Sequence, residues 1–147
     1  MKLLIISPGK THNSTVAEGI GEYAKRLPKS FSLEWVHPKP ESVEVEGVAI
    51  LKLVKKEDFV ILLDERGKDI DTPGFAKLLE RHLGEGTKRL VFIIGGAFGV
   101  SVAVTERANL TLKLSSLVFP HMLVRLILTE QLYRASSILE GSKYHHA

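Results

Sequence analysis

Three apolar runs that barely alternate with polar residues constrain the fold of this chain more than any other feature. They cover residues 2–7, 59–63 and 90–94. A strand with one exposed face alternates apolar and polar residues, so these runs predict strands that are covered on both faces. Weaker strand patterns follow at residues 31–36 and 110–114. Such strands are typical of a parallel sheet flanked by two layers of helices.

Helical patterns separate the expected strands. Asn13 or Ser14 can cap the first helix, Thr72 and Pro73 are typical of a helix start, and Ser101 can cap a further helix. Helices are therefore expected from residue 14 to the approach of Pro28, over 48–56 after a polar loop at 38–46, over 72–83, after Ser101, and over 122–139. A turn is expected directly after Asp64. Strand and helix alternate five times, which predicts the α/β class with helices on both faces of a parallel sheet.

Composition limits the classes to which the chain can belong. Its 147 residues, 44% of them hydrophobic and 25% charged, suit one domain with one buried core. No apolar run approaches the roughly 20 residues of a membrane span, and the N-terminal apolar run is too short for a secretory signal, so a soluble cytoplasmic protein is expected. The absence of cysteine excludes disulfides and thiolate chemistry. A net charge of +3 permits contact with nucleic acid without demanding it.

A glycine-rich loop, IIGGAFGVS, follows one of the buried strands and leads into a helix. Backbone amides in such a loop can face a ligand because no side chain intervenes. The dinucleotide-binding fingerprint fails here, since its first glycine would fall on Ile94, and the lysine of a phosphate-binding P-loop is absent. A ligand without phosphates fits this loop better. The alternative is a glycine turn that serves only tight strand-to-helix packing.

Ligands of open α/β sheets bind beyond the carboxyl ends of the strands. Three such ends are expected here, at Leu63 and Asp64, at Gly95 and Gly96, and at residues 115–119. They can meet over one pocket, where leucine side chains would form apolar walls for an adenine ring and the main chain would bind its edge. The alternative is that these leucines belong to the core.

The final helix carries polar groups that packing alone would not select. His121 and Arg125 share one face if the helix has begun by His121, and Glu130 pairs with Arg134 at a favourable spacing. Arginine can clamp a phosphate, and the neighbouring Tyr133 can stack on a base. Surface ion pairing alone also explains the second pair. His145 and His146 lie in the last three residues, where a disordered tail is the ordinary expectation, and no other liganding cluster supports a metal site.

With these motifs, the chain resembles the SPOUT class of methyltransferases, and within it the small single-domain family that methylates N3 of a pseudouridine in large-subunit ribosomal RNA. The resemblance covers essentially the whole chain. Its most specific segments are LLDERGKDIDTP, FIIGGAFG, LSSLVFPH, LVRLILTEQLYRA and the terminal YHH. It implies a C-terminal trefoil knot, which no periodicity argument reveals. It also implies S-adenosyl-L-methionine as cofactor and a homodimer that acts on assembled ribosomes.

The resemblance also implies roles for particular residues. The family's cofactor-binding elements correspond to Leu63, Gly95, Leu114, Ser115, Ser116, Leu117, Val118 and Phe119. The RNA-facing, catalytic site, which the family forms between subunits, corresponds to His121, Arg125, Tyr133, Arg134, Tyr144 and His145. The family's tail usually ends in Tyr-His and a basic residue, whereas His146 and Ala147 follow His145 here. A permanent charge is therefore missing from the tail, and its RNA contact is expected to be weaker or pH-dependent.

The implied reaction mainly requires the protein to position the methyl donor against the base. A methyl group on a sulfonium must meet N3 in line, and the N3 proton must leave. Arg125 or Arg134 can stabilise negative charge on the neighbouring carbonyl oxygens, and His121 or His145 can accept the proton. The residues do not decide between these assignments. Two competing classes are a non-enzymatic RNA-binding module on the same fold, and a Rossmann-type nucleotide enzyme, which the failed fingerprint disfavours.

Overall fold

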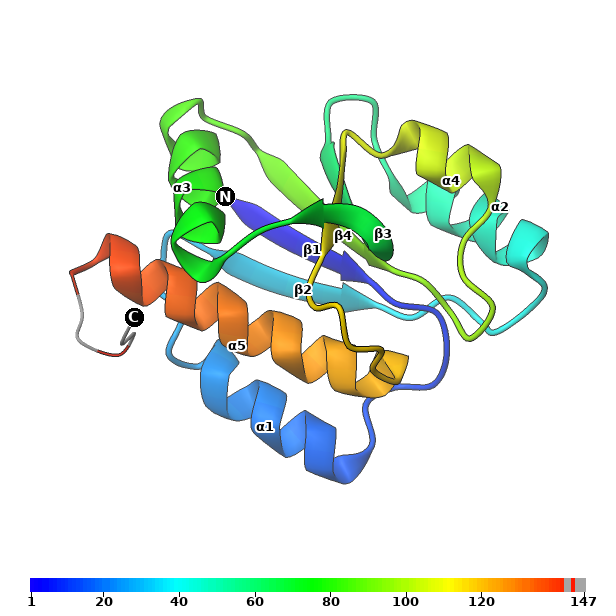
Figure 1. Ribbon diagram of the computed structural model, residues 1–147, viewed down its shortest axis with the longest axis horizontal. Coiled ribbons are helices and arrows are strands. Elements are labelled where there is room, and N and C mark those ends of the chain that lie inside the picture. Colours follow the sequence, from blue (N-terminus) through cyan, green and yellow to red (C-terminus); the bar gives the residue numbers. More distant parts are fainter. Residues whose placement is uncertain (142–143, 145–147) are drawn as a thin grey trace.

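The structure, a computed structural model, describes residues 1–141 and Tyr144. Strands and helices alternate along the chain, as the sequence predicts (Figure 1). Their order is β1 (Lys2–Ile6), α1 (Ser14–Ala24), β2 (Ser32–Val36), α2 (Val43–Leu53), β3 (Phe59–Asp69), α3 (Thr72–Gly84), β4 (Arg89–Ile94), α4 (Val102–Arg107), β5 (Leu110–Lys113) and α5 (His121–Leu139).

All strand pairs of the sheet are parallel, and the strand order is β2-β1-β4-β3-β5. The fold class is therefore α/β, as expected. The chain builds β1 and β2 side by side and then crosses over to β3, and β4 returns to fill the space between β1 and β3. This arrangement brings the carboxyl ends of β4, β3 and β5 together at one edge of the sheet, which is the usual location of a ligand site in open parallel sheets.

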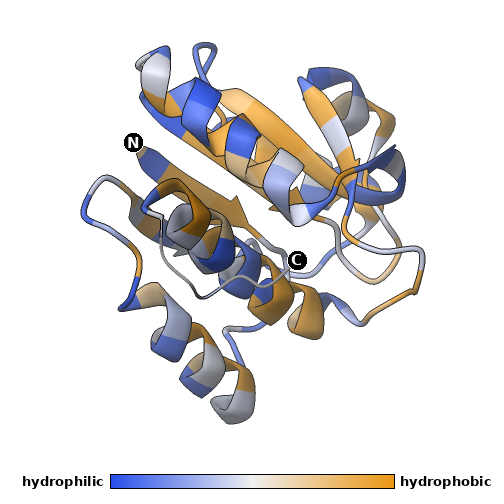
Figure 2. Ribbon diagram, turned by 60° about the vertical axis from the view of Figure 1, so that its left-hand side comes forward, coloured by the Kyte–Doolittle hydropathy of each residue, from blue (hydrophilic) through white to orange (hydrophobic). Residues whose placement is uncertain are grey.

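Helices cover both faces of the sheet. α1, α3 and α5 pack beside one another on one face, and α2 packs against α4 on the other (Figure 1). Successive residues of β1 pack on opposite faces of the sheet. Leu3 and Ile5 belong to the apolar cluster under α3 and α5, whereas Leu4 and Ile6 belong to the cluster that includes residues of α2 and α4. The strands in the middle of the sheet are accordingly mostly hydrophobic (Figure 2). Burial on both faces explains why the runs in the sequence do not alternate.

Two expected boundaries are wrong. β3 does not turn after Asp64 but continues to Asp69, and its pairing with β5 shifts register between Leu63 and Lys68. Gly67 permits this irregularity, because a Cβ there would lie 2.7 Å from the carbonyl carbon of Leu112. In addition, α2 begins at Val43 rather than near residue 48. The Ser42 hydroxyl accepts a hydrogen bond from the Val45 amide and caps this earlier start.

The other helix starts agree closely with the expectation. Asn13 caps α1 and Ser101 caps α4, each by accepting a hydrogen bond from a backbone amide of the first turn. The cap of α3 is Asp71 and not Thr72, which is the first helical residue. Within residues 1–141 and 144, no helix has the length and apolar character needed to cross a bilayer.

Candidate functional site: a cleft at the carboxyl ends of three strands

A cleft of about 760 Å³ lies where β3, β4 and β5 end. The loop after Ile94, the loop between β5 and α5, and the chain just past Leu63 enclose it. The three expected strand ends therefore do meet over one pocket. The lining residues are Leu63, Asp64, Glu65, Arg66, Ile94, Gly95, Gly96, Ala97, Phe98, Gly99, Val100, Leu114, Ser115, Leu117, Val118, Phe119, Pro120, His121 and Val124.

The cofactor-binding residues expected from the resemblance gather at this cleft. All of them line it except Ser116, which is exposed in the same loop. The sequence analysis placed Asp64 at an expected strand end but missed the contributions of Glu65 and Arg66, which follow it directly. Glu65 and Arg66 were assigned to a turn after Asp64, whereas β3 continues through them to Asp69. Their role in ligand binding is a prediction, like that of the other lining residues.

Gly95 and its neighbours form a tight turn at the end of β4. Gly96 and Gly99 pair as an isolated bridge, and Gly99 has a φ of +87°, which favours glycine. A Cβ at Gly95 would lie 3.1 Å from Cγ1 of Val100. The turn also leaves Phe98 87% exposed at the rim of the cleft. Three glycines, Gly95, Gly96 and Gly99, thus form the tight turn and add no side chain to this wall of the cleft.

The opposite wall is an ordered loop of mixed character. The Ser115 hydroxyl accepts a hydrogen bond from the Leu117 amide, so the loop has a defined turn at its start. Leu63 and Leu114 are partly buried, whereas Leu117 and Val118 are exposed. Apolar walls with main-chain donors and acceptors suit a flat ring.

Carboxylates stand at one side of the cleft. Asp64 receives two hydrogen bonds of 3.1 Å from the guanidinium of Arg66, and these bonds lower the pKa of the Asp64 carboxyl, with partial burial opposing them. Asp64 is therefore ionised at neutral pH. Together with the exposed Glu65, it places negative charge beside the apolar walls. A ligand that combines an aromatic ring with a cationic group would fit both features.

His121 and Arg125 lie on one face at the start of α5, as expected if the helix begins at His121. His121 lines the cleft, but Arg125 is fully buried behind it. The guanidinium of Arg125 donates hydrogen bonds to the Ser7 hydroxyl and to the carbonyl oxygens of Ser7, Pro8 and Lys10. The sequence analysis did not connect this residue with the Pro8-Gly9 turn, which lies at the opposite end of the chain.

Histidine side chains surround this guanidinium. The His12 ring lies 4.5 Å from the Trp35 ring and 5.1 Å from the His37 ring, between centroids. Partial burial, then the charges of His37 and Arg125, lower the pKa of His12 to about 4. Partial burial and Arg125 also lower the pKa of His121, which Glu46 opposes. These imidazoles are therefore neutral at pH 7, although they face a cation. Among the described residues no cluster of three or more His, Cys, Asp or Glu side chains is placed to bind a metal ion.

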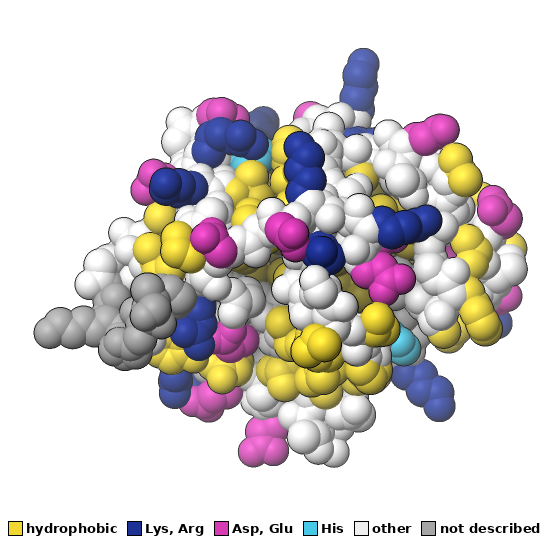
Figure 3. Space-filling model, viewed as in Figure 1, with side chains coloured by type: hydrophobic (Ala, Val, Ile, Leu, Met, Phe, Trp, Pro, Cys, Tyr) yellow, Lys and Arg dark blue, Asp and Glu magenta, His cyan; other side chains and the backbone are white. Residues whose placement is uncertain are grey.

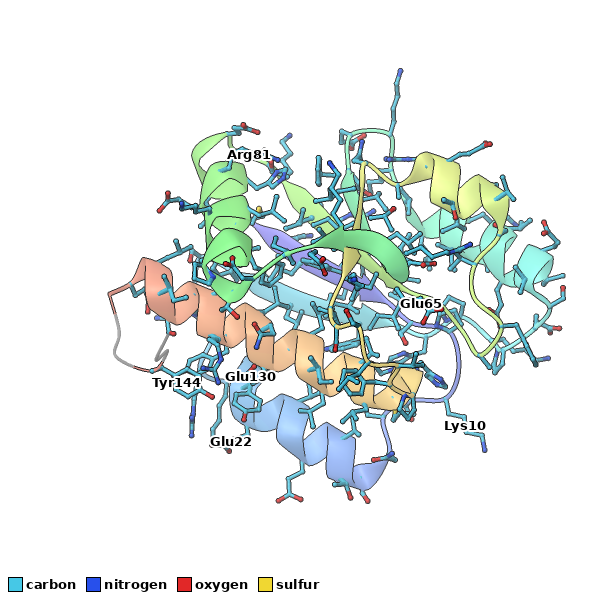
Figure 4. All side chains as sticks on the ribbon, in the orientation of Figure 1. Lys10, Glu22, Glu65, Arg81, Glu130 and Tyr144 are labelled. Carbon is cyan, nitrogen blue, oxygen red and sulfur yellow. The ribbon has the colours of Figure 1, made fainter. Side chains whose placement is uncertain are left out.

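The remaining expected RNA-facing residues lie at the other end of α5. Arg134 and Glu130 form the expected ion pair, with 2.7 Å between nitrogen and oxygen. The Tyr144 ring lies 4.7 Å from the Tyr133 ring and 4.8 Å from the Arg134 guanidinium. Glu130 and Tyr144 lie to the left of Glu65 in Figure 4, well separated from it. His145 lies outside the described residues.

One chain does not bring the two groups of residues together. Twelve positions separate His121 from Tyr133 along α5, which is about 18 Å at the helical rise of 1.5 Å per residue. Hydrophobic side chains gather over the start of α5 on the face shown in Figure 3. Leu117, Val118 and Leu123 are exposed in this region of the chain. An exposed apolar region of this kind is typical of a surface that another molecule covers.

Known methyltransferases are similar to the whole chain. Residues 1–145 match a family described as predicted SPOUT methyltransferase. Ribosomal RNA large subunit methyltransferase H of Geotalea daltonii is 40% identical over 153 residues, which cover 99% of this chain and 100% of that protein. Proteins of the same name from Cytophaga hutchinsonii and Streptococcus pneumoniae are each 37% identical. These matches cover 99% of this chain, with 100% and 99% of the respective relatives.

Proposed function

Because the chain belongs to the SPOUT methyltransferase family, we propose that it methylates N3 of a pseudouridine in large-subunit ribosomal RNA, with S-adenosyl-L-methionine as the methyl donor. The observation that carries this proposal is the cleft at the ends of β3, β4 and β5, at which the expected donor-binding residues converge. The names of the relatives refer to the RNA of the large ribosomal subunit. The pseudouridine and its N3 atom follow from the motif resemblance.

The residues of the cleft fit this donor. Leu63 and Leu114 offer apolar contact to an adenine ring, and Gly95 leaves room beside it. Asp64 and Glu65 can bind the cationic amino group or favour the positive sulfonium. When bound, S-adenosylmethionine supplies an electrophilic methyl group. The absence of a P-loop lysine agrees with a ligand that carries no phosphate.

The protein's own contribution to the chemistry is position and charge. His121 lines the cleft and carries a lowered pKa, so its neutral imidazole can accept the proton that leaves N3, directly or through water. Arg134 can stabilise negative charge that develops on the carbonyl oxygens of the base. Tyr133, Tyr144 and His145 are proposed to contact the RNA.

A homodimer would unite these residues. The cleft and the Tyr133–Arg134 group are about 18 Å apart on one chain, which is too far for one nucleotide to bridge as a single reaction centre. A second copy that covers the exposed apolar region near Leu123 can present its own Tyr133 and Arg134 to the cleft. Cyclic dimers of this kind are the commonest assemblies of identical chains.

We further propose the trefoil knot of the family for the C-terminal segment. The connection between β5 and α5 lies against the loops that follow β3 and β4, since all three border one cleft. A chain that passes through the loop between those strands would produce this proximity. The extension of β3 to Asp69, which pairs with β5 beyond the register shift, supports the same interpretation.

Methyl transfer from labelled S-adenosylmethionine is expected to be efficient on assembled ribosomes and poor on naked ribosomal RNA. A dimer would carry a net charge of only +6, twice the +3 of one chain, so its electrostatic attraction for RNA is modest and shape must supply the rest. The measurement is label incorporation, followed by mass spectrometry of the modified nucleoside. Donor binding without any transfer to ribosomes would instead favour a non-enzymatic RNA-binding module.

Leu123→Asp is expected to convert the dimer to a monomer at micromolar concentration and to abolish methyl transfer. The aspartate would place a charge in the apolar contact near the start of α5. Light scattering measures the mass of the variant and of the wild type. Val48→Asp is the matched control, because Val48 is an exposed valine on α2 at the other face of the sheet. A monomeric wild-type protein would contradict the proposed dimer.

A further inference from the structure

Arg125 is a buried charge with an unusual set of partners. Its side chain has 0% exposure, and none of the ion pairs among residues 1–141 and 144 includes it. A guanidinium without a carboxylate is costly to bury unless hydrogen bonds replace its hydration. Most of the acceptors belong to the turn at residues 7–10: the Ser7 hydroxyl and three backbone carbonyl groups. Nη1 also contacts Nδ1 of His12 and Sδ of Met122, each over 3.4 Å. The charge is therefore used to bind a stretch of main chain.

These bonds enclose the turn at residues 7–10. Nε donates to the Ser7 hydroxyl over 2.8 Å, and Nη1 donates to the Lys10 carbonyl over 2.8 Å. Nη2 donates to the Ser7 and Pro8 carbonyls, each over 3.3 Å. The planar guanidinium presents its donors in a fixed geometry, so it defines the shape of the turn and not only its location.

The turn in its defined shape packs beside His121. Gly9 has a φ of +120°, and a Cβ there would lie 3.5 Å from both Nε2 of His121 and Nη2 of Arg125. The Gly9 amide also donates to the Pro38 carbonyl over 2.9 Å. The turn is thus held between the end of β2 and the start of α5. His121 lines the cleft and has this turn beside its Nε2 atom.

We propose that Arg125 is a positioning residue that acts through the turn at residues 7–10 to hold the His121 imidazole at the mouth of the cleft. It does not contact the RNA, in contrast to the role that the resemblance implies. The expected effect of Arg125 on the rate of methyl transfer rests on the proposed function. Its expected effect on the position and charge of His121 is independent of that function.

The charge of Arg125 also affects His121, because a neighbouring cation favours the neutral form of the imidazole. Burial and this neighbouring cation lower the pKa of His121, and Glu46 on α2 partly opposes them. Other charged groups at the cleft are Asp64, Glu65 and Arg66. Removal of the cation would let protonation begin at higher pH, so a neutral imidazole would be lost earlier as the pH falls from 7.

Arg125→Lys and Arg125→Met test this proposal in the full-length protein. Lysine keeps the charge but cannot reproduce the fixed fork of donors, and methionine removes both. The kcat on ribosomes is expected to fall about 10-fold in the lysine variant and about 100-fold in the methionine variant. The KM for ribosomes and the affinity for S-adenosylmethionine should stay within about threefold. Arg81→Met, which removes an exposed arginine from α3, is the control and should change none of these values.

NMR titration of His121 in the ligand-free protein gives a readout that needs no activity. In Arg125→Met the pKa of His121 should rise toward 6.5, and the pH profile of kcat should move to higher pH with it. Arg125→Lys keeps the NMR comparison possible if the methionine variant does not fold. An unchanged His121 resonance and pKa in the folded variants would overturn the proposal.

An RNA contact by Arg125 would give a different pattern. The KM for ribosomes would rise, the salt dependence of binding would weaken by about one charge, and kcat would be unaffected. That result would also overturn the proposal. If the wild-type protein transfers no methyl group at all, the proposed function fails, and the NMR comparison still decides whether Arg125 positions His121.

Discussion

Gly95→Leu is expected to weaken the binding of S-adenosylmethionine at least about 100-fold, which is about 2.7 kcal/mol of binding free energy. A Cβ at this position already lies 3.1 Å from Val100 Cγ1 and 3.3 Å from the Gly99 carbonyl carbon. Gly95 lines the cleft, so the longer leucine side chain is expected to extend into the space proposed for the donor. Isothermal titration calorimetry measures the affinity.

Gly84→Leu is the matched control for this substitution. Gly84 ends α3, and a Cβ at this position would have no neighbouring atom within 4 Å, so the leucine side chain would extend into solvent. Circular dichroism of both variants reports whether the fold is retained. Gly95→Ala should give an intermediate loss of about 10-fold, since its single methyl group requires only a small shift of the turn. Full donor affinity in a folded Gly95→Leu protein would remove the cleft from the proposed mechanism.

Deletion of residues 144–147 is expected to reduce methyl transfer to ribosomes by about 1,000-fold and to leave donor affinity within about twofold. Among the described residues, those that line the cleft end at Val124, so donor binding is expected not to depend on the tail. Tyr144, by contrast, contacts Tyr133 and Arg134 at the other end of α5. If Tyr144 and His145 contact the RNA as proposed, their loss would remove positioning contacts and leave the cleft intact.

The two activities must be measured on the same truncated protein. Deletion of only His146 and Ala147 is the control, because the proposal assigns RNA contacts to Tyr144 and His145 and none to these two residues. It should leave methyl transfer near the wild-type rate. A normal rate in the longer deletion would exclude the tail from the RNA-facing site. Simultaneous loss of donor binding would show instead that the tail supports the cleft.

The central strands were predictable because burial on both faces requires a run of consecutive apolar residues, which is visible in a short stretch of sequence. The same holds for helix starts at Asn13 and Ser101, where one side chain caps the neighbouring amides. The continuation of β3 after Asp64 has no such apolar run, because residues 65–69 are polar apart from Gly67. Pairing with the distant β5 holds that segment in the sheet. Long-range hydrogen bonds overrode local preference there.

The candidate site also has a part that could be predicted from the sequence and a part that could not. Strand ends in a parallel sheet must lie at one edge, so Leu63, Gly95 and residues 114–119 could be grouped from the sequence alone. The environment of Arg125 could not be inferred, because Ser7, which accepts its Nε hydrogen bond, is 118 positions away. Local spacing gave Arg125 only a shared helix face with His121. Whether that arginine meets solvent, RNA or main chain depends on which distant turn packs against α5, and such packing has no local signature.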